Sequence, residues 1–168
     1  LMIGDVGDNY AQRDRVSVTV IIEPDPSQPA NASITPVWQQ EFRYANGAMD
    51  CESIAVDTQA KQILLLSKRR IPHELYRLPL SFEPKMKASS QPEIATASLL
   101  GRLSLAAPLK GLEAEQYGTA APYMHMPTDM TLRDDRLLVM TMKNAFVFSL
   151  QSILQQAAAG VATSQPAD

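Results

Sequence analysis

Residues 63–69 read ILLLSKR, and this stretch decides the predicted fold. A short apolar run bounded by turn residues is typical of a strand that is buried on both faces. It follows SIAVD at residues 53–57 and precedes ELYRL at residues 74–78, two further strand-like runs. The three runs predict one unit of consecutive antiparallel strands.

The same order of strands recurs later in the chain. DMTLR at residues 129–133, LLVMTMK at 137–143 and AFVFSL at 145–150 repeat the short, long and closing runs. Residues 1–5 and 15–22 match the last two parts of the unit, whose first strand is missing there. A repeated unit of three or four strands indicates a radial β array. The sequence therefore predicts an all-β fold, a partial β-propeller of about two and a half blades, each a four-stranded antiparallel sheet.

The rest of the chain completes this prediction. Residues 37–44 are predicted to form another strand, and residues 95–105 to supply a fourth strand within a long insertion that spans 82–127. Residues 1–150 are expected to form the partial propeller domain. Residues 151–168 are expected to form a short helix and a disordered tail.

The predicted C-terminal helix carries its own start and stop signals. LQSILQQAAA at residues 150–159 is rich in helix formers. Ser149 is a candidate N-cap, and Gly160 follows the last helical residue, where glycine is favoured.

Composition excludes several classes of function. The net charge is −3, the 15 basic residues are scattered and aromatic residues make up 6%, which argues against nucleic-acid binding. The single cysteine, Cys51, rules out an intrachain disulfide. No apolar run reaches the length that crosses a bilayer, about 20 residues. The chain shown contains no signal peptide, although a signal upstream of Leu1 remains compatible with the sequence.

Several segments resemble those of a known group of proteins. They are IGDVGDN at residues 3–9 with Arg13, ESIAVD at 52–57, TDM at 128–130 and NAFVF at 144–148. They resemble a bacterial β-propeller family with a GDxGDN motif, which is similar in outline to phytase-like and gluconolactonase-like six-bladed propellers. Ser53 stands where the family pattern has alanine. The resemblance implies a six-bladed parent protein that is periplasmic or secreted.

The predicted propeller brings a set of polar residues to one face. Connections between blades and between the two middle strands of a blade lie on the same face, around the channel. Oxygen-bearing side chains there could hold calcium, which takes roughly six to eight oxygen ligands. The candidate metal ligands are Glu52, Asp129, Asp5, Asp8 and Asn9. Lys68 and Arg69 could bind an anionic substrate group.

Each candidate also has a purely structural interpretation. Asp8 and Asn9 with Arg13 are compatible with a hairpin loop held by a side chain-to-backbone turn and an Asp–Arg pair. Gly4 and Gly7 would then supply positive φ angles.

The other candidates have alternatives of the same kind. Glu52 and Asp129 could satisfy loop amides, and Lys68 and Arg69 could be solvated loop residues. His125 could act as a general base or be incidental.

Two functions stay open at this stage. The first is an exported binding or interaction module for a small-molecule or protein ligand. The second is a calcium-dependent hydrolase of phytase-like or lactonase-like type, built on Glu52, Asp129 and the loop at residues 4–9. Because the predicted propeller is incomplete, self-association is also expected.

Overall fold

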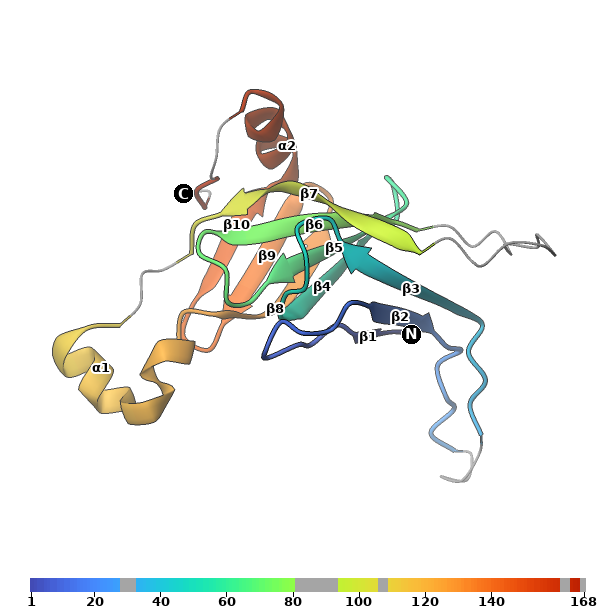
Figure 1. Cartoon of the computed structure of the whole chain (residues 1–168), viewed down its shortest axis with the longest axis horizontal. Helices are drawn as coiled ribbons and strands as arrows, with labels where there is room; N and C mark the ends of the chain where they lie inside the picture. The colour runs from blue at the N-terminus through green and yellow to red at the C-terminus, as the bar shows by residue number, and fades with distance from the viewer. Residues whose placement is uncertain (28–32, 81–93, 106–108, 161–163, 167–168) are drawn as a thin grey trace.

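The computed structural model describes residues 1–27, 33–80, 94–105, 109–160 and 164–166 (Figure 1). The described part of the chain is mostly β structure, which confirms the all-β prediction. Its strands are β1 (Met2–Asp5), β2 (Val16–Val20), β3 (Trp38–Tyr44), β4 (Cys51–Asp57), β5 (Gln62–Ser67), β6 (His73–Pro79), β7 (Ala95–Leu103), β8 (Pro127–Arg133), β9 (Arg136–Thr141) and β10 (Ala145–Ser149). The helices are α1 (Gly111–Tyr117), a 3-10 helix (Gly118–Tyr123) and α2 (Leu150–Ala158).

The strands form three antiparallel meanders. The N-terminal meander is β1–β3, the middle meander is β4–β7, and the C-terminal meander is β8–β10. β7 fulfils the prediction of a fourth strand, and α1 and the 3-10 helix occupy part of the predicted insertion. Residues 82–93 and 106–108 of the predicted insertion lie outside the described residues.

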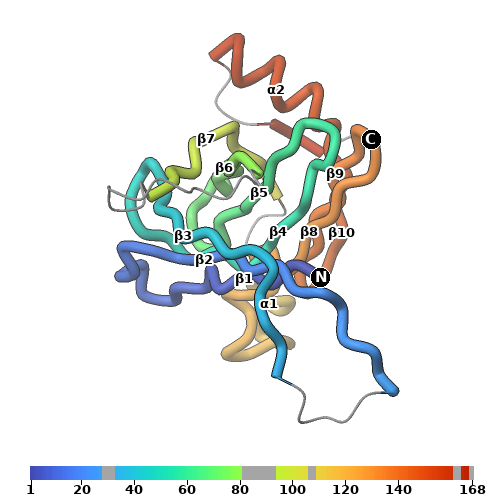
Figure 2. The backbone as a smooth tube through the Cα atoms, turned by 90° about the vertical axis from the view of Figure 1, so that its right-hand side faces the viewer, coloured from blue at the N-terminus to red at the C-terminus, as the bar shows by residue number. Residues whose placement is uncertain are grey.

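The N-terminal and middle meanders join into one sheet. Phe42–Tyr44 of β3 pairs in parallel with Ala95–Ala97 of β7, which gives the strand order β1-β2-β3-β7-β6-β5-β4. The prediction of purely antiparallel sheets is therefore wrong at this junction. The seven-stranded sheet curls into a nearly closed, barrel-like form, so that its end strands β1 and β4 approach one another below the centre of the molecule (Figures 1 and 2).

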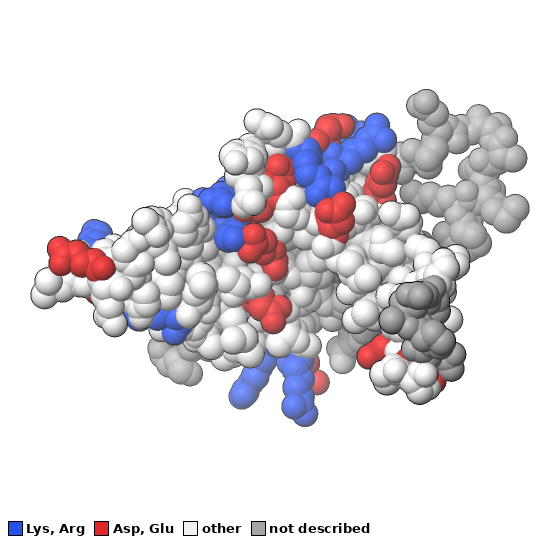
Figure 3. Space-filling view, turned by 90° about the horizontal axis from the view of Figure 1, so that it is seen from below, with Lys and Arg blue, Asp and Glu red and all other residues white. Residues whose placement is uncertain are grey.

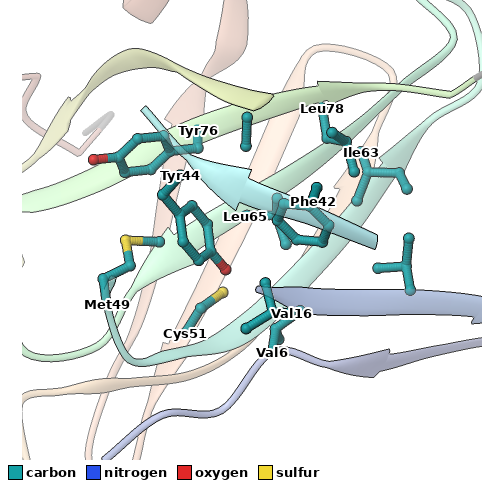
Figure 4. Packing of buried hydrophobic residues seen from close by; sticks show 12 residues of the cluster. Val6, Val16, Phe42, Tyr44, Met49, Cys51, Ile63, Leu65, Tyr76 and Leu78 are labelled. Atoms are coloured by element: carbon teal, nitrogen blue, oxygen red, sulfur yellow. The ribbon is translucent and has the colours of Figure 1, made fainter. Parts of the chain in front are cut away.

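The middle meander is buried on both faces, as predicted from residues 63–69. In β5, Ile63 and Leu65 face one core, shared with the N-terminal meander (Figure 4). Leu64 and Leu66 face a second core, shared with the C-terminal meander. All four are fully buried, and each contributes about 1.5–3 kcal/mol relative to an exposed side chain.

The C-terminal meander is covered on one face only within the described residues. Leu137 and Val139 of β9 are fully buried against the middle meander. The alternate residue Met140 is 45% exposed and Val147 of β10 is 37% exposed, while Leu138 is half-buried. This outer apolar face therefore lacks the cover that both faces of the middle meander have.

The helix α2 begins and ends as predicted. The Ser149 side chain accepts a hydrogen bond from the Ser152 N–H at 3.0 Å, and Gly160 adopts a φ of 74° just after the helix. Ile153 packs into the second core, above Gly101 of β7. None of the helices in the described segments is long and apolar enough to span a membrane.

Part of the predicted disordered tail is ordered. The Ser164 N–H donates to the Arg102 carbonyl at 2.7 Å, and the Ser104 N–H donates to the Ser164 carbonyl at 2.9 Å. Residues 161–163 and 167–168 of the predicted tail lie outside the described residues.

Candidate functional site

A pocket of about 530 Å³ lies between β1, β4 and β8. β1 and β4 are the two end strands of the seven-stranded sheet, and β8 is an end strand of the other sheet. The pocket is lined by Met2, Gly4, Val6, Gly7, Cys51, Glu52, Ile54, Ala55, Val56, Asp129, Met130 and Thr131. Its volume falls in the range of small-molecule sites, about 300–1,000 Å³. Three strand edges without a ladder partner in the described structure therefore surround one ligand-sized space.

Glu52 reaches this pocket because of a β-bulge. The pairing of β4 with β5 shifts between Cys51 and Ser53, so Glu52 is the extra residue and leaves the regular alternation. Its Oε1 lies 2.6 Å from the Lys68 Nζ, and its side chain is 36% exposed. The carboxylate is thus neutralised on one side and open to the pocket on the other.

Asp129 reaches the same pocket from the start of β8, where it follows the bulge residue Thr128. The pairing of β8 with β9 shifts between Pro127 and Asp129, which repeats the bulge at the start of β4. Asp129 Oδ1 accepts a hydrogen bond from the Met130 N–H at 2.7 Å. Its Oδ2 has no hydrogen-bond partner among the described residues, so this oxygen is available to a ligand.

Asp5 does not line the pocket, because alternation along β1 points it to the opposite face from Gly4. Its two carboxylate oxygens each accept from the Arg13 guanidinium at 2.8 Å. This bidentate pair lowers the pKa of Asp5. The Asp–Arg pair predicted for Asp8 and Arg13 is thus formed by Asp5 and Arg13 instead.

Asp8 holds the loop between β1 and β2. Its Oδ2 accepts from the Arg13 N–H at 2.8 Å, which confirms the predicted side chain-to-backbone turn. Partial desolvation raises the pKa of Asp8, but hydrogen bonds from the N–H groups of Arg13, Gln12 and Tyr10 outweigh it and the net pKa is lowered. The carboxylate is thus occupied by loop amides and is not among the pocket residues.

Asp50 is the polar residue that connects this loop to β4, and it is absent from the candidates predicted above. Asp50 is 4% exposed. Its Oδ1 accepts from the Asp8 N–H at 2.9 Å, and its Oδ2 accepts from the Arg69 Nε at 2.8 Å. The sequence did carry one indication of a structural role, since Asp50 stands between the apolar residues Met49 and Cys51. Both neighbours are buried in the structure.

The predicted anion-binding residues are engaged by acidic and amide groups. Lys68 pairs with Glu52. Besides Asp50, Arg69 binds Asn9 Oδ1 through Nη2 at 2.6 Å and lies 5.8 Å from the centre of the Tyr123 ring. Charges of both signs are interspersed on the face seen in Figure 3. Binding of an anion by either side chain would therefore compete with an existing ion pair.

The expected positive φ angles at Gly4 and Gly7 are wrong, since neither glycine adopts one. Gly4 instead lies in close approach to the Ile54 side chain. A Cβ built on Gly4 would lie 2.1 Å from the Ile54 Cδ1, whereas a Cβ on Gly7 would meet no atom within 4 Å. A side chain at position 4 would therefore displace the end of the Ile54 side chain beside the pocket.

Both histidines are buried. His73 Nδ1 lies 3.0 Å from the Ser67 carbonyl oxygen. His125 is 5% exposed, and neither of its ring nitrogens has a hydrogen-bond partner in the described structure. Burial lowers the pKa of both imidazoles. Neither residue lines the pocket, so the geometry gives His125 no substrate-facing position there.

The pocket brings together Glu52 and Asp129, two of the five predicted metal ligands. Within the described segments, no group of three or more histidine, cysteine, aspartate or glutamate residues is placed to hold a metal ion. Comparison of the chain with protein-family models, with curated proteins and with solved structures gives no match. The functional argument therefore rests on the geometry of this pocket.

Proposed function

We propose that this chain is part of an exported β-propeller that serves as a binding module, with the pocket between β1, β4 and β8 as its ligand site. The observation that carries this proposal is the convergence of Glu52 and Asp129 on one pocket of about 530 Å³. Their strands are far apart in sequence, but each begins with the same bulge. The ligand could be a small molecule or a segment of another protein.

Equivalent packing of successive meanders supports the propeller. Ile63 and Leu65 of β5 pack against the preceding meander, as Leu137 and Val139 of β9 do. The alternate residues of β5 pack against the following meander. Leu138 and Met140 occupy the corresponding positions in β9 and are half-buried or exposed, as expected for a face on which a further blade packs.

The sequence resemblance agrees with this assignment. The three motif regions fall on the loop after β1, on the start of β4, and on β8 to β10. All three regions contribute to the pocket lining, the first through Gly4 and Gly7, the second through Glu52 and the third through Asp129. Membership of the GDxGDN propeller family, a six-bladed parent and export to the periplasm or the medium are parts of the same proposal.

A calcium-dependent hydrolase is the second candidate, and the open Oδ2 of Asp129 favours it. Glu52 and Asp129 would supply two carboxylates, and unpaired backbone carbonyls at the strand edges could supply more of the oxygen ligands that calcium requires. Bound calcium would act as a Lewis acid or activate a water. Lys68 would orient an anionic substrate group from its place beside Glu52.

Thermal unfolding separates the two candidates. The chelator-treated protein is heated with and without millimolar calcium, alongside Glu52→Gln and Asp129→Asn. A calcium-induced rise in Tm that both variants lose supports the metal site, since a ligand stabilises the state that binds it, and phosphoester and lactone hydrolysis would then be assayed. Without a calcium response, a screen of small molecules and peptides follows. A ligand-induced rise in Tm that Asp129→Asn abolishes supports the binding module, and ligands that act equally on all variants contradict this pocket as the site.

A further inference from the structure

We propose that His73 and His125 together bind a monovalent copper ion, Cu(I), at the buried junction of the middle and C-terminal meanders. They are the two histidines of the chain. Neither residue lines the pocket between β1, β4 and β8. Copper binding would therefore be separate from the binding of a ligand in that pocket.

The His125 side chain is buried without a hydrogen-bond partner. It is 5% exposed, and neither Nδ1 nor Nε2 has a partner within the described residues. A buried polar group that is left unpaired costs about 1–3 kcal/mol, so such groups are rare in folded proteins. A metal ion bound to one ring nitrogen would supply the missing partner.

The imidazole of His73 is held in the form that can bind a metal. The residue is 2% exposed, and burial lowers its pKa, so the ring is neutral at neutral pH. Its Nδ1 lies 3.0 Å from the Ser67 carbonyl oxygen. A carbonyl oxygen only accepts, so Nδ1 carries the proton and Nε2 keeps its lone pair. Histidines that bind a metal almost always donate their other N–H in this way.

The His73 side chain points to the junction of the middle and C-terminal meanders. Residues two apart along a strand share a face, so His73 lies on the same face of β6 as Leu75. Leu75 packs in the second core, together with Leu137 and Val139 of β9. His73 therefore stands at the end of this core, at the first residue of β6.

The segment that carries His125 lies over the same end of the middle meander. Tyr123, two residues before His125, has its ring centre 5.8 Å from the guanidinium of Arg69. Arg69 follows two residues after Ser67, whose carbonyl His73 contacts. Besides burial, the charge of a protonated His125 lowers the pKa of His73, as expected of neighbouring imidazoles. The two rings therefore lie close to one another at the end of the second core.

The charge of the surrounding groups favours a monovalent ion. Glu74 points to the opposite face of β6 from His73, and its carboxylate already pairs with Arg70 and Arg102. Within the described segments, no cysteine or carboxylate joins the two histidines in a metal-binding group. Zinc takes roughly three or four protein ligands, and a buried divalent charge without an anionic ligand would be costly. Imidazole also suits copper, and Cu(I) carries a single charge and is stable with few ligands.

Titration of the whole chain with Cu(I) against a coloured Cu(I) chelator, in the absence of oxygen, tests the proposal. We expect a single Cu(I) per chain. His73→Phe and His125→Phe should each weaken binding at least about a hundredfold, since loss of the group that holds a ligating histidine already costs about 10–100-fold. Cys51→Ala is the matched control, because it removes the buried thiol and should leave the affinity unchanged. Circular dichroism and Tm establish that the variants are folded.

X-ray absorption at the copper edge gives an independent readout on the unaltered protein. We expect nitrogen atoms in the first coordination shell. Binding should weaken between about pH 7 and about pH 5, because imidazole must be neutral to coordinate a metal. Asp129→Asn should bind Cu(I) as the unaltered protein does, which separates this site from the proposed ligand pocket.

Four results would overturn the copper site. They are a lack of Cu(I) binding, unchanged binding in folded His125→Phe, a first shell of sulfur alone, and tighter binding of Zn(II) than of Cu(I) to the same two histidines. None of these results bears on the proposed function, which depends on Asp129.

Discussion

The backbone N–H of Asp8 donates to the Oδ1 of Asp50 at 2.9 Å, across 42 positions of sequence. This bond fastens the loop after β1 to the start of β4, next to the pocket. The other oxygen of Asp50 is held by Arg69, which in turn binds Asn9. One buried carboxylate therefore fixes the two strand edges whose separation defines the proposed ligand site.

Replacing Asp50 should destabilise the protein substantially. Asp50→Ala leaves the Asp8 N–H and the Arg69 guanidinium without their partner, and breaking a buried ion pair costs about 3–5 kcal/mol. Because the Arg69 side chain is 37% exposed, we expect about 2–3 kcal/mol in urea unfolding. The control is Asp14→Ala, whose side chain is 84% exposed. If both changes have an equal, small effect, the contacts of Asp50 with the Asp8 N–H and Arg69 do not stabilise the fold.

Adding a methyl group at Gly4 should destabilise the protein modestly, and the effect should depend on Ile54. The Cβ of Gly4→Ala would lie 2.1 Å from the Ile54 Cδ1, and because the end of this side chain can rotate, we expect a cost at the low end of overpacking, about 1 kcal/mol. In a double-mutant cycle, Gly4→Ala in an Ile54→Ala background should cost clearly less. Gly7→Ala is the control, since its Cβ meets no atom within 4 Å. Additive costs would refute the contact as the cause.

Mild acid should destabilise the protein through its two histidines. Burial lowers the pKa of His73 and His125 below 6.5 in the folded state. As the pH falls, these histidines therefore bind protons in the unfolded chain at a higher pH than in the folded protein. The free energy of unfolding then falls below about pH 6.5, by at most about 1.4 kcal/mol per pH unit for each histidine. His125→Phe should flatten this slope, because the imidazole has no hydrogen-bond partner in the described structure. The unfolding free energy of His125→Phe is measured between pH 8 and pH 5. Its dependence on pH should differ from that of the unaltered protein only below about pH 6.5.

The slope at lower pH should be unaffected by that change. Asp5 and Asp8 have lowered pKa values, so their contribution is complete above about pH 4 and is lost as the pH falls further. If the unfolding free energy of His125→Phe falls as steeply between pH 6.5 and pH 5 as that of the unaltered protein, His125 is not the cause of the destabilisation in mild acid.

The outer face of the C-terminal meander should promote weak self-association. Met140 and Val147 expose apolar surface there, as does Met142 after β9, at 62%. Met140→Lys should weaken association about tenfold in a sedimentation velocity concentration series. Thr19→Lys, on the outer face of the N-terminal meander, is the matched control. Equal association of both variants would locate the contact on another surface.

Local pattern predicted most of the strands but not how the meanders join. Alternation and turn residues were sufficient for β5, β9 and their neighbours, because each strand carries its own signal. The parallel pairing of Phe42–Tyr44 with Ala95–Ala97 joins segments that no local pattern connects. The helix α1 lay within the predicted insertion, and its short sequence has no buried residue to mark one apolar face.

The candidate site was predicted in part for similar reasons. Glu52 and Asp129 share the pocket because they begin equivalent strands, which the repeat indicated. Asp5 alternates with Gly4 along β1, so its opposite orientation followed from the period of two and could have been deduced. The Asp8 contact with Asp50 could not, since it joins two meanders across the chain.

The double burial of β5 has a consequence for how the chain finds its alignment. A strand with one polar face cannot slip by one residue without exposing its apolar side chains. Residues 63–66 are apolar at every position, so a slip would exchange the two cores at little hydrophobic cost. The polar residues at the two ends of β5 therefore determine its correct alignment. Gln62 donates to Asp57 Oδ2 at 2.9 Å, and the Ser67 Oγ accepts from the Glu74 N–H at 2.7 Å. Changes at these two positions should lead to misaligned, slowly correcting folding intermediates more readily than changes among the leucines between them.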